Sequence, residues 1–109
     1  MNKDAALRAL DDCRRRIDEL DLRILDLLNE RTRVVETIGR AKRLLQMPIY
    51  EPRREDEVYA NVTGHNGGPL PSEAVKRIFE RIIDEMRTVQ KLRMQDRQES
   101  APAGRERER

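Results

Sequence analysis

The stretch AALRALDDCRRRIDELDLRILDLLNERTRVVETIGRAKRLLQ, residues 5–46, sets the architecture of the chain. It contains no proline and a single glycine, Gly39, and it is rich in Leu, Arg, Glu and Ala, which favour helix. Apolar residues recur in it in alternating steps of three and four: Leu10, Cys13, Ile17, Leu20, Ile24, Leu27, Val34, Ile38, Ala41 and Leu45. One helix of this length would extend about 60 Å, roughly twice the diameter of a small domain. Because one subunit cannot cover such an apolar seam, the stretch predicts a dimer.

Two shorter helices are predicted after this stretch. Pro48 ends the first helix, and a second helix begins near Pro52 with Glu51 at its cap, because proline suits the first helical position. The breaker cluster of residues 64–69 precedes a third helix that starts at residues 71–73. Its apolar stripe consists of Val75, Ile78, Phe79, Ile82, Ile83, Met86 and Val89. The predicted fold class is all-α, with one very long, one short and one medium helix per chain in an intertwined helical homodimer.

Composition limits the classes of function. The 109 residues suit one domain, predicted at residues 1–94, followed by a charged and disordered tail at residues 95–109. The net charge is only +2, and basic and acidic residues are interleaved, which argues against a nucleic-acid partner. A single cysteine, Cys13, allows no disulfide within the chain. Because no apolar run approaches a signal segment or a membrane span, we expect a cytoplasmic protein without a membrane partner.

Arg31 interrupts the seam at a position where its register requires an apolar side chain. An arginine there loses water, at a cost of several kcal/mol unless an anion pairs with it. Lys42 follows eleven residues later, close to three helical turns, so both cations project from nearly the same face. Arg14 lies about 25 Å of helix from Arg31 but could approach it across an antiparallel dimer. These residues indicate an anionic ligand shared by two subunits, or, alternatively, polar residues that fix the register of the seam.

Several spaced motifs carry a family resemblance. They are Arg14-x-x-Ile17-x-x-Leu20-Asp21, Leu27-Leu28-x-Glu30-Arg31, Ile38-Gly39-x-Ala41-Lys42, Pro52-x-Arg54-Glu55, and Ile78-Phe79-x-x-Ile82-Ile83 followed by Gln90. From about Leu7 to Lys91 the chain resembles the all-helical chorismate mutases. Tyr50-Glu51-Pro52 and Gly68-Pro69-Leu70-Pro71 look most similar to mutase domains fused to DAHP synthase, which makes such a synthase a candidate partner.

The resemblance implies that chorismate rearranges to prephenate, in the biosynthesis of phenylalanine and tyrosine, without a cofactor or metal. By this resemblance Arg14 of the partner subunit and Arg31 hold the two substrate carboxylates, since a guanidinium grips a carboxylate through two hydrogen bonds. Lys42 and Gln90 would reach the ether oxygen, where negative charge develops in the transition state.

The same resemblance assigns residues around the second helix. Glu55 would hydrogen-bond the ring hydroxyl with a backbone amide near Glu51, and Arg54 would support the carboxylate side. Without the resemblance, Glu55 is an ordinary first-turn glutamate favoured by the helix dipole. Glu51 replaces a shorter aspartate that is more common in the family, and Met86 replaces a serine found in some relatives.

Three other interpretations remain open at this point. The chain also resembles the isochorismate pyruvate-lyases, which are similar in fold and use similar Arg, Lys and Gln positions. A regulatory module that docks on a DAHP synthase would retain its helices mainly for contact. A plain helical dimerisation or nucleic-acid module would leave Arg31 and Lys42 without a role.

Overall fold

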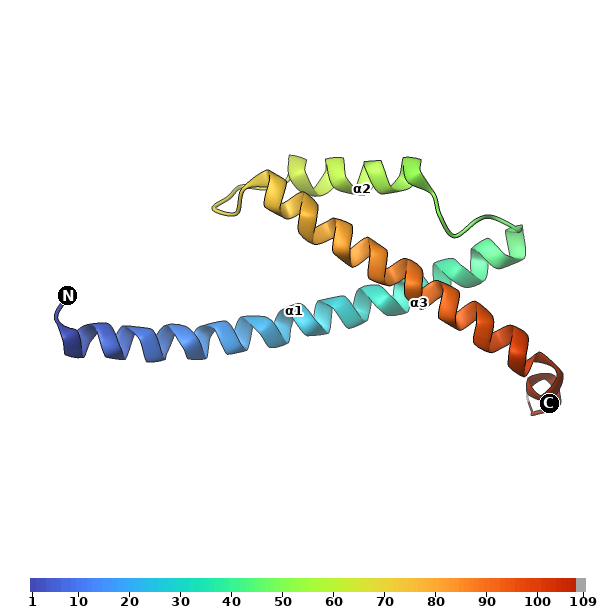
Figure 1. The fold of residues 1–109 in the computed structure, drawn as a ribbon, viewed down its shortest axis with the longest axis horizontal. Helices are drawn as coiled ribbons and strands as arrows, with labels where there is room; N and C mark the ends of the chain where they lie inside the picture. The colour runs from blue at the N-terminus through green and yellow to red at the C-terminus, as the bar shows by residue number, and fades with distance from the viewer. Residues whose placement is uncertain (108–109) are drawn as a thin grey trace. The chain divides into compact units, whose positions relative to one another are not determined.

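The chain folds into three helices, in agreement with the predicted all-α class (Figure 1). The structure, a computed structural model, describes the backbone of residues 1–107 and the side chains of residues 1–93. The helices are α1 (Lys3–Leu45), α2 (Pro52–Gly64) and α3 (Ser72–Arg107). They begin where the proline and breaker signals place them, and the described part contains no strand. None of its helices is long and apolar enough to cross a membrane.

The third helix continues beyond its apolar stripe. Its apolar stripe ends at Val89, yet α3 continues to Arg107. The side chains of residues 94–107, and all of residues 108–109, lie outside the described residues. The division into a domain at residues 1–94 and a disordered tail at 95–109 therefore stays a prediction.

The chain divides into two compact units, Met1–Val34 and Val35–Arg109. The first unit is the N-terminal part of α1, and four of its seam residues are 45–64% exposed in the single chain: Leu10, Ile17, Ile24 and Leu27. Cys13 is also exposed here, although its seam position predicts a buried apolar group. The dimer that would cover this seam stays a prediction.

A tight turn ends α1 and reverses the chain. Gln46 adopts a left-handed backbone conformation with φ of 58°. The Met47 N–H donates to the Lys42 carbonyl at 2.8 Å, and the Gln46 N–H donates to the Arg43 carbonyl at 3.2 Å. These two bonds are those of a Schellman motif, which satisfies carbonyls that a helix end otherwise leaves unpaired. The turn directs residues 47–51 back past Lys42 toward the start of α2.

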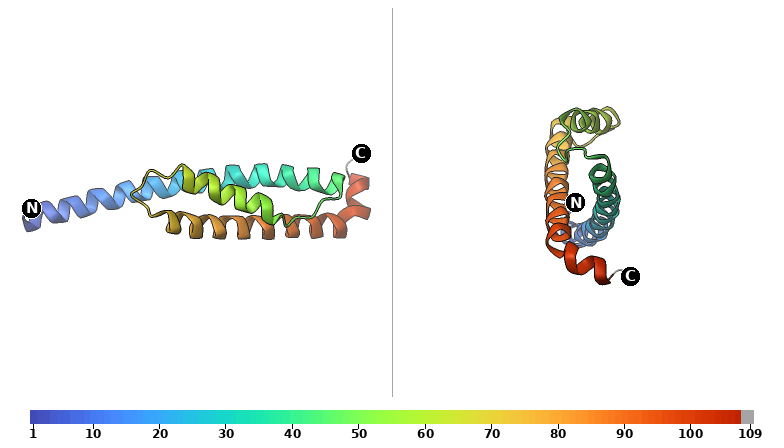
Figure 2. Two further views of the ribbon diagram at one scale, coloured as in Figure 1. Left: turned by 90° about the horizontal axis from the view of Figure 1, so that it is seen from above. Right: turned by 90° about the vertical axis from the view of Figure 1, so that its right-hand side faces the viewer.

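The second unit contains the packed part of the molecule. Its helices α2 and α3 pack against each other and run in opposite directions, joined by residues 65–71 (Figures 1 and 2). Among residues 35–93, the buried apolar side chains are Val35 on α1 and three residues of the α3 stripe, Val75, Ile83 and Met86. The part of α1 that follows Val34, the turn and the two packed helices together position the polar residues described next.

Candidate active site

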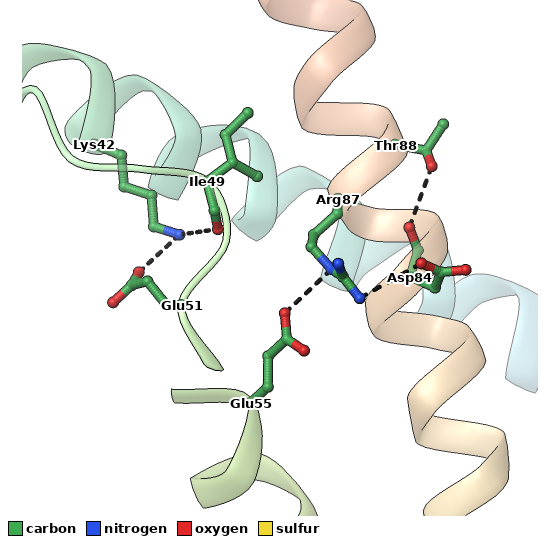
Figure 3. Close-up of polar contacts among 7 residues, drawn as sticks. All are labelled: Lys42, Ile49, Glu51, Glu55, Asp84, Arg87 and Thr88. Carbon is green, nitrogen blue, oxygen red and sulfur yellow. Dashed lines mark hydrogen bonds and ion pairs between the residues drawn. The ribbon is translucent and has the colours of Figure 1, made fainter. Parts of the chain in front are cut away.

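Lys42 is a buried lysine near the end of α1, only 9% exposed. Its Nζ donates to the Ile49 carbonyl at 2.9 Å and lies 2.7 Å from Glu51 Oε1 (Figure 3). Both partners belong to the segment that the turn at Gln46 brings back along the helix. A lysine ammonium has three protons, so two are directed by these contacts and one can serve a ligand.

Glu51 lies at the start of α2 and forms an ion pair with Lys42. It is the N-cap residue of α2, as predicted, but its side chain makes no capping hydrogen bond. The carboxylate instead pairs with Lys42, and its side chain is 32% exposed. The extra methylene that distinguishes glutamate from aspartate thus extends the carboxylate toward the lysine.

Gln90 on α3 is the second buried polar side chain, 7% exposed. Its Nε2 donates to the Val35 carbonyl on α1 at 3.3 Å, and its Cγ would lie 3.7 Å from a Cβ built on Gly39. Gly39 and Lys42 are three residues apart, so they share one face of α1. Gln90 therefore packs one turn from Lys42, and one of its two amide protons is committed to Val35.

Glu55 in the first turn of α2 pairs with Arg87 of α3 (Figure 3). Arg87 Nε lies 3.1 Å from Glu55 Oε2, and this buried Nε lacks the alignment of a hydrogen bond. Arg87 Nη2 also lies 3.4 Å from Asp84 Oδ1, and its guanidinium carbon lies 5.1 Å from the centre of the Tyr50 ring. The resemblance assigns no role to Arg87. The sequence does contain a signal for Arg87. It comes four residues after Ile83 and three before Gln90, so it lies on the same face of α3 as these two residues.

An open cavity of about 500 Å³ adjoins this pair. Its walls are Tyr59, Arg77, Glu80, Arg81, Asp84 and Arg87. Burial, followed by the charges of Glu55 and Glu80, raises the pKa of Tyr59 above its ordinary value of 10.0. Tyr59 therefore presents a neutral phenol near Glu55 at physiological pH.

Some predicted site residues lie apart from these contacts. Arg54 is exposed and pairs with Glu57 at 3.4 Å along the surface of α2. Arg14 and Arg31 belong to the unit Met1–Val34, where Arg14 is exposed and Arg31 is half-buried with polar interactions. The ligand roles of these three arginines stay predictions. No group of three or more His, Cys, Asp or Glu side chains among residues 1–93 is placed to hold a metal.

Comparison with known proteins assigns the family. Residues 13–91 match the family model described as chorismate mutase type II. The chain belongs to this family. Over 89 residues it is 35% identical to the bifunctional chorismate mutase/prephenate dehydratase of Aquifex aeolicus, covering 78% of this chain and 25% of that protein. It thus spans about a quarter of the length of that relative. It is also 40% identical over 57 residues to the 4-amino-4-deoxychorismate mutase of Streptomyces pristinaespiralis, covering 52% of this chain and 44% of that protein.

Solved chorismate mutases share the fold. Form II of the enzyme from Thermus thermophilus superimposes with a TM-score of 0.74 at 35% identity, covering 76% of this chain and 94% of that one. The enzyme from Helicobacter pylori in complex with prephenate gives a TM-score of 0.76 at 26% identity, covering 81% and 96%. The resemblance to chorismate mutases is confirmed. These relatives stand alone or are fused to prephenate dehydratase, so the more specific likeness to DAHP synthase fusions stays a prediction.

The family motifs mark positions that the structure buries or partly buries, and the roles of these residues stay predictions. Lys42 and Gln90 are buried hydrogen-bond donors, a type of group that can stabilise negative charge developing on an oxygen. Glu55 is an acceptor on the neighbouring helix, suited to a hydroxyl.

Proposed function

We propose that the protein is a chorismate mutase that converts chorismate to prephenate in phenylalanine and tyrosine biosynthesis. One observation supports this most strongly. Lys42 and Gln90 are the buried polar or charged residues among the side chains of residues 1–93, and the family motifs point to the same two positions. Their contacts use two of the three Lys42 protons and one of the two Gln90 amide protons, and a buried donor without an acceptor costs free energy, so the remaining protons favour a role in binding or catalysis.

The proposed reaction is an intramolecular Claisen rearrangement. The ether C–O bond breaks while a new C–C bond forms in the same molecule, and no proton, electron or water enters. The third Lys42 proton and the second Gln90 amide proton would point to the ether oxygen and stabilise the charge that accumulates there. Holding the substrate in its compact, reactive shape supplies the remaining effect.

Glu55 and Glu51 complete the part of the site that lies in the second unit. Glu55 would accept a hydrogen bond from the ring hydroxyl, assisted by a backbone amide near Glu51. Through its 2.7 Å contact with Lys42, the Glu51 carboxylate would hold the ammonium in position. A similar holding role belongs to the Ile49 carbonyl.

The carboxylates of the substrate would be held by Arg31 and by Arg14 of the partner subunit, with support from Arg54. This part of the proposal requires the homodimer. The exposed apolar seam of the unit Met1–Val34 supports it, because burying large apolar side chains is the main favourable term in association. Cytoplasmic location stays a prediction from the sequence.

The rival functions make different products. An isochorismate pyruvate-lyase would release pyruvate from isochorismate, and a regulatory module would need an added DAHP synthase for appreciable activity. Because one relative is the 4-amino-4-deoxychorismate mutase of Streptomyces pristinaespiralis, 4-amino-4-deoxychorismate is a further substrate to test. This compound has an amino group in place of the ring hydroxyl.

Purified protein should consume chorismate and form prephenate without an added metal or cofactor. The assay follows the loss of chorismate absorbance and identifies prephenate by chromatography, with isochorismate tested in parallel for pyruvate. Light scattering at the assay concentration should give twice the mass of the 12.8 kDa chain. Absence of prephenate, or pyruvate as the main product, would overturn the proposal, and an active monomer would overturn the shared site.

A further inference from the structure

The Arg87–Glu55 pair changes the charge that Glu55 offers to a ligand. The two side chains are 30% and 15% exposed, so both have lost most of their contact with water. In such surroundings a charge is weakly screened, and a single carboxylate would attract a cation strongly. Arg87 Nε lies 3.1 Å from Glu55 Oε2. A ligand next to Glu55 therefore meets an ion pair with almost no net charge.

Arg87 is held in place by contacts other than Glu55. Asp84 Oδ1 lies 3.4 Å from its Nη2, and the face of Tyr50 lies 5.1 Å from the guanidinium carbon. Because Asp84 is 58% exposed, water screens its charge more than that of Glu55. The guanidinium also borders the open cavity of about 500 Å³, whose lining does not include Glu55. Its positive charge is therefore a fixed feature of the surroundings of Glu55.

We infer that Arg87 is a specificity-determining residue that favours a hydroxyl over an ammonium on the ring carbon next to Glu55. The inference rests on the proposed function, in which Glu55 accepts a hydrogen bond from the ring hydroxyl. A neutral hydroxyl gains that bond without repulsion from the guanidinium. An ammonium at the same carbon brings a second positive charge against Arg87, and like charges at close range in a poorly screened site oppose binding.

The test compares chorismate with 4-amino-4-deoxychorismate, whose substituent is cationic when protonated. The measured quantity is the ratio of kcat/KM for chorismate to kcat/KM for the amino analogue. In the Arg87→Met variant, which keeps an unbranched apolar chain without the charge, this ratio should fall by about ten-fold or more. Arg87→Lys keeps the positive charge and should retain most of the preference.

Arg81→Met is the matched control. Arg81 lies on the same helix, borders the same cavity and pairs with Asp84 and Glu85, but it makes no contact with Glu55. Its replacement should leave the ratio unchanged. Glu55→Gln removes the negative charge that faces Arg87. The ratio of kcat/KM for chorismate to that for the amino analogue should then rise. This variant provides a test if Arg87→Met does not fold.

Two failures can be distinguished. If the wild-type protein does not convert chorismate, the proposed function fails. If it converts chorismate but the ratio is the same in Arg87→Met as in the wild type, or falls equally in Arg81→Met, the role of Arg87 is refuted while the proposed function stands. A fall in kcat/KM for both substrates by the same factor would also refute it, because a general support role changes activity without changing selectivity.

Discussion

Replacing Lys42 by methionine separates the stabilising and the catalytic contributions of this residue. Methionine retains the apolar stem but loses the hydrogen bond to Ile49 and the ion pair with Glu51. The hydrogen bond contributes about 1 kcal/mol and the pair, whose glutamate is a third exposed, about 1 kcal/mol at most. The free energy of unfolding should therefore fall by about 1–2 kcal/mol. Helix content should remain, since one side chain of the 43-residue α1 is changed.

The loss of activity in Lys42→Met should be larger than this loss of stability suggests. A preorganised donor to a developing oxyanion contributes about 10²–10³-fold in rate, or roughly 3–4 kcal/mol. We expect kcat/KM for chorismate to fall by at least this factor under conditions where urea titration shows the variant folded. Lys91→Met is the control, because Lys91 is an exposed lysine on α3. A Lys42→Met rate within about five-fold of the wild type would refute the assignment of Lys42 to the transition state.

Three further outcomes are expected. Gln90→Glu should be active mainly at acid pH, because a buried glutamate donates a hydrogen bond only when protonated; a kcat/KM that does not rise as the pH falls would contradict the role of Gln90. Gln46→Gly should raise the free energy of unfolding by about 0.5–1 kcal/mol in urea titrations, since glycine adopts a φ of 58° without strain. In Tyr50→Phe, Tyr59 is the remaining tyrosine of two, and its absorbance should titrate above pH 10.0. Because the folded chain then holds this proton more tightly than the unfolded chain, stability should fall as pH rises through that midpoint; a midpoint at or below 10.0 would contradict the partial burial of Tyr59.

The helices could be predicted from the sequence because their signals are local. The proline-free stretch before Pro48 predicted α1, and Pro52 placed the start of α2 with Glu51 at its cap. The end of α3 lies beyond its apolar stripe, because helical hydrogen bonds can continue after such a stripe has ended. The burial of Lys42 and Gln90 agrees with the positions that the family motifs marked.

The partners of these residues could not be predicted, because they depend on how separate segments meet. Nothing in the local pattern shows that the Ile49 carbonyl accepts from Lys42, or that Val35 accepts from Gln90. Arg87 was missed because an arginine in a helix of alternating charge usually faces solvent, and only the packing of α3 against α2 brings it to Glu55. Arg54, predicted to support the site, pairs with Glu57 on the surface of α2, and its ligand role stays a prediction.

At the end of α1, Lys42 has two separate roles. Its backbone carbonyl takes part in the turn that ends the helix, and its side chain is the candidate catalytic ammonium. The Lys42 carbonyl receives the Met47 N–H, and the Lys42 side chain donates to Ile49 two residues farther along. An inserted or deleted residue between these anchors would displace the backbone turn and the ammonium together. Length variation during evolution should therefore be rare in this connection.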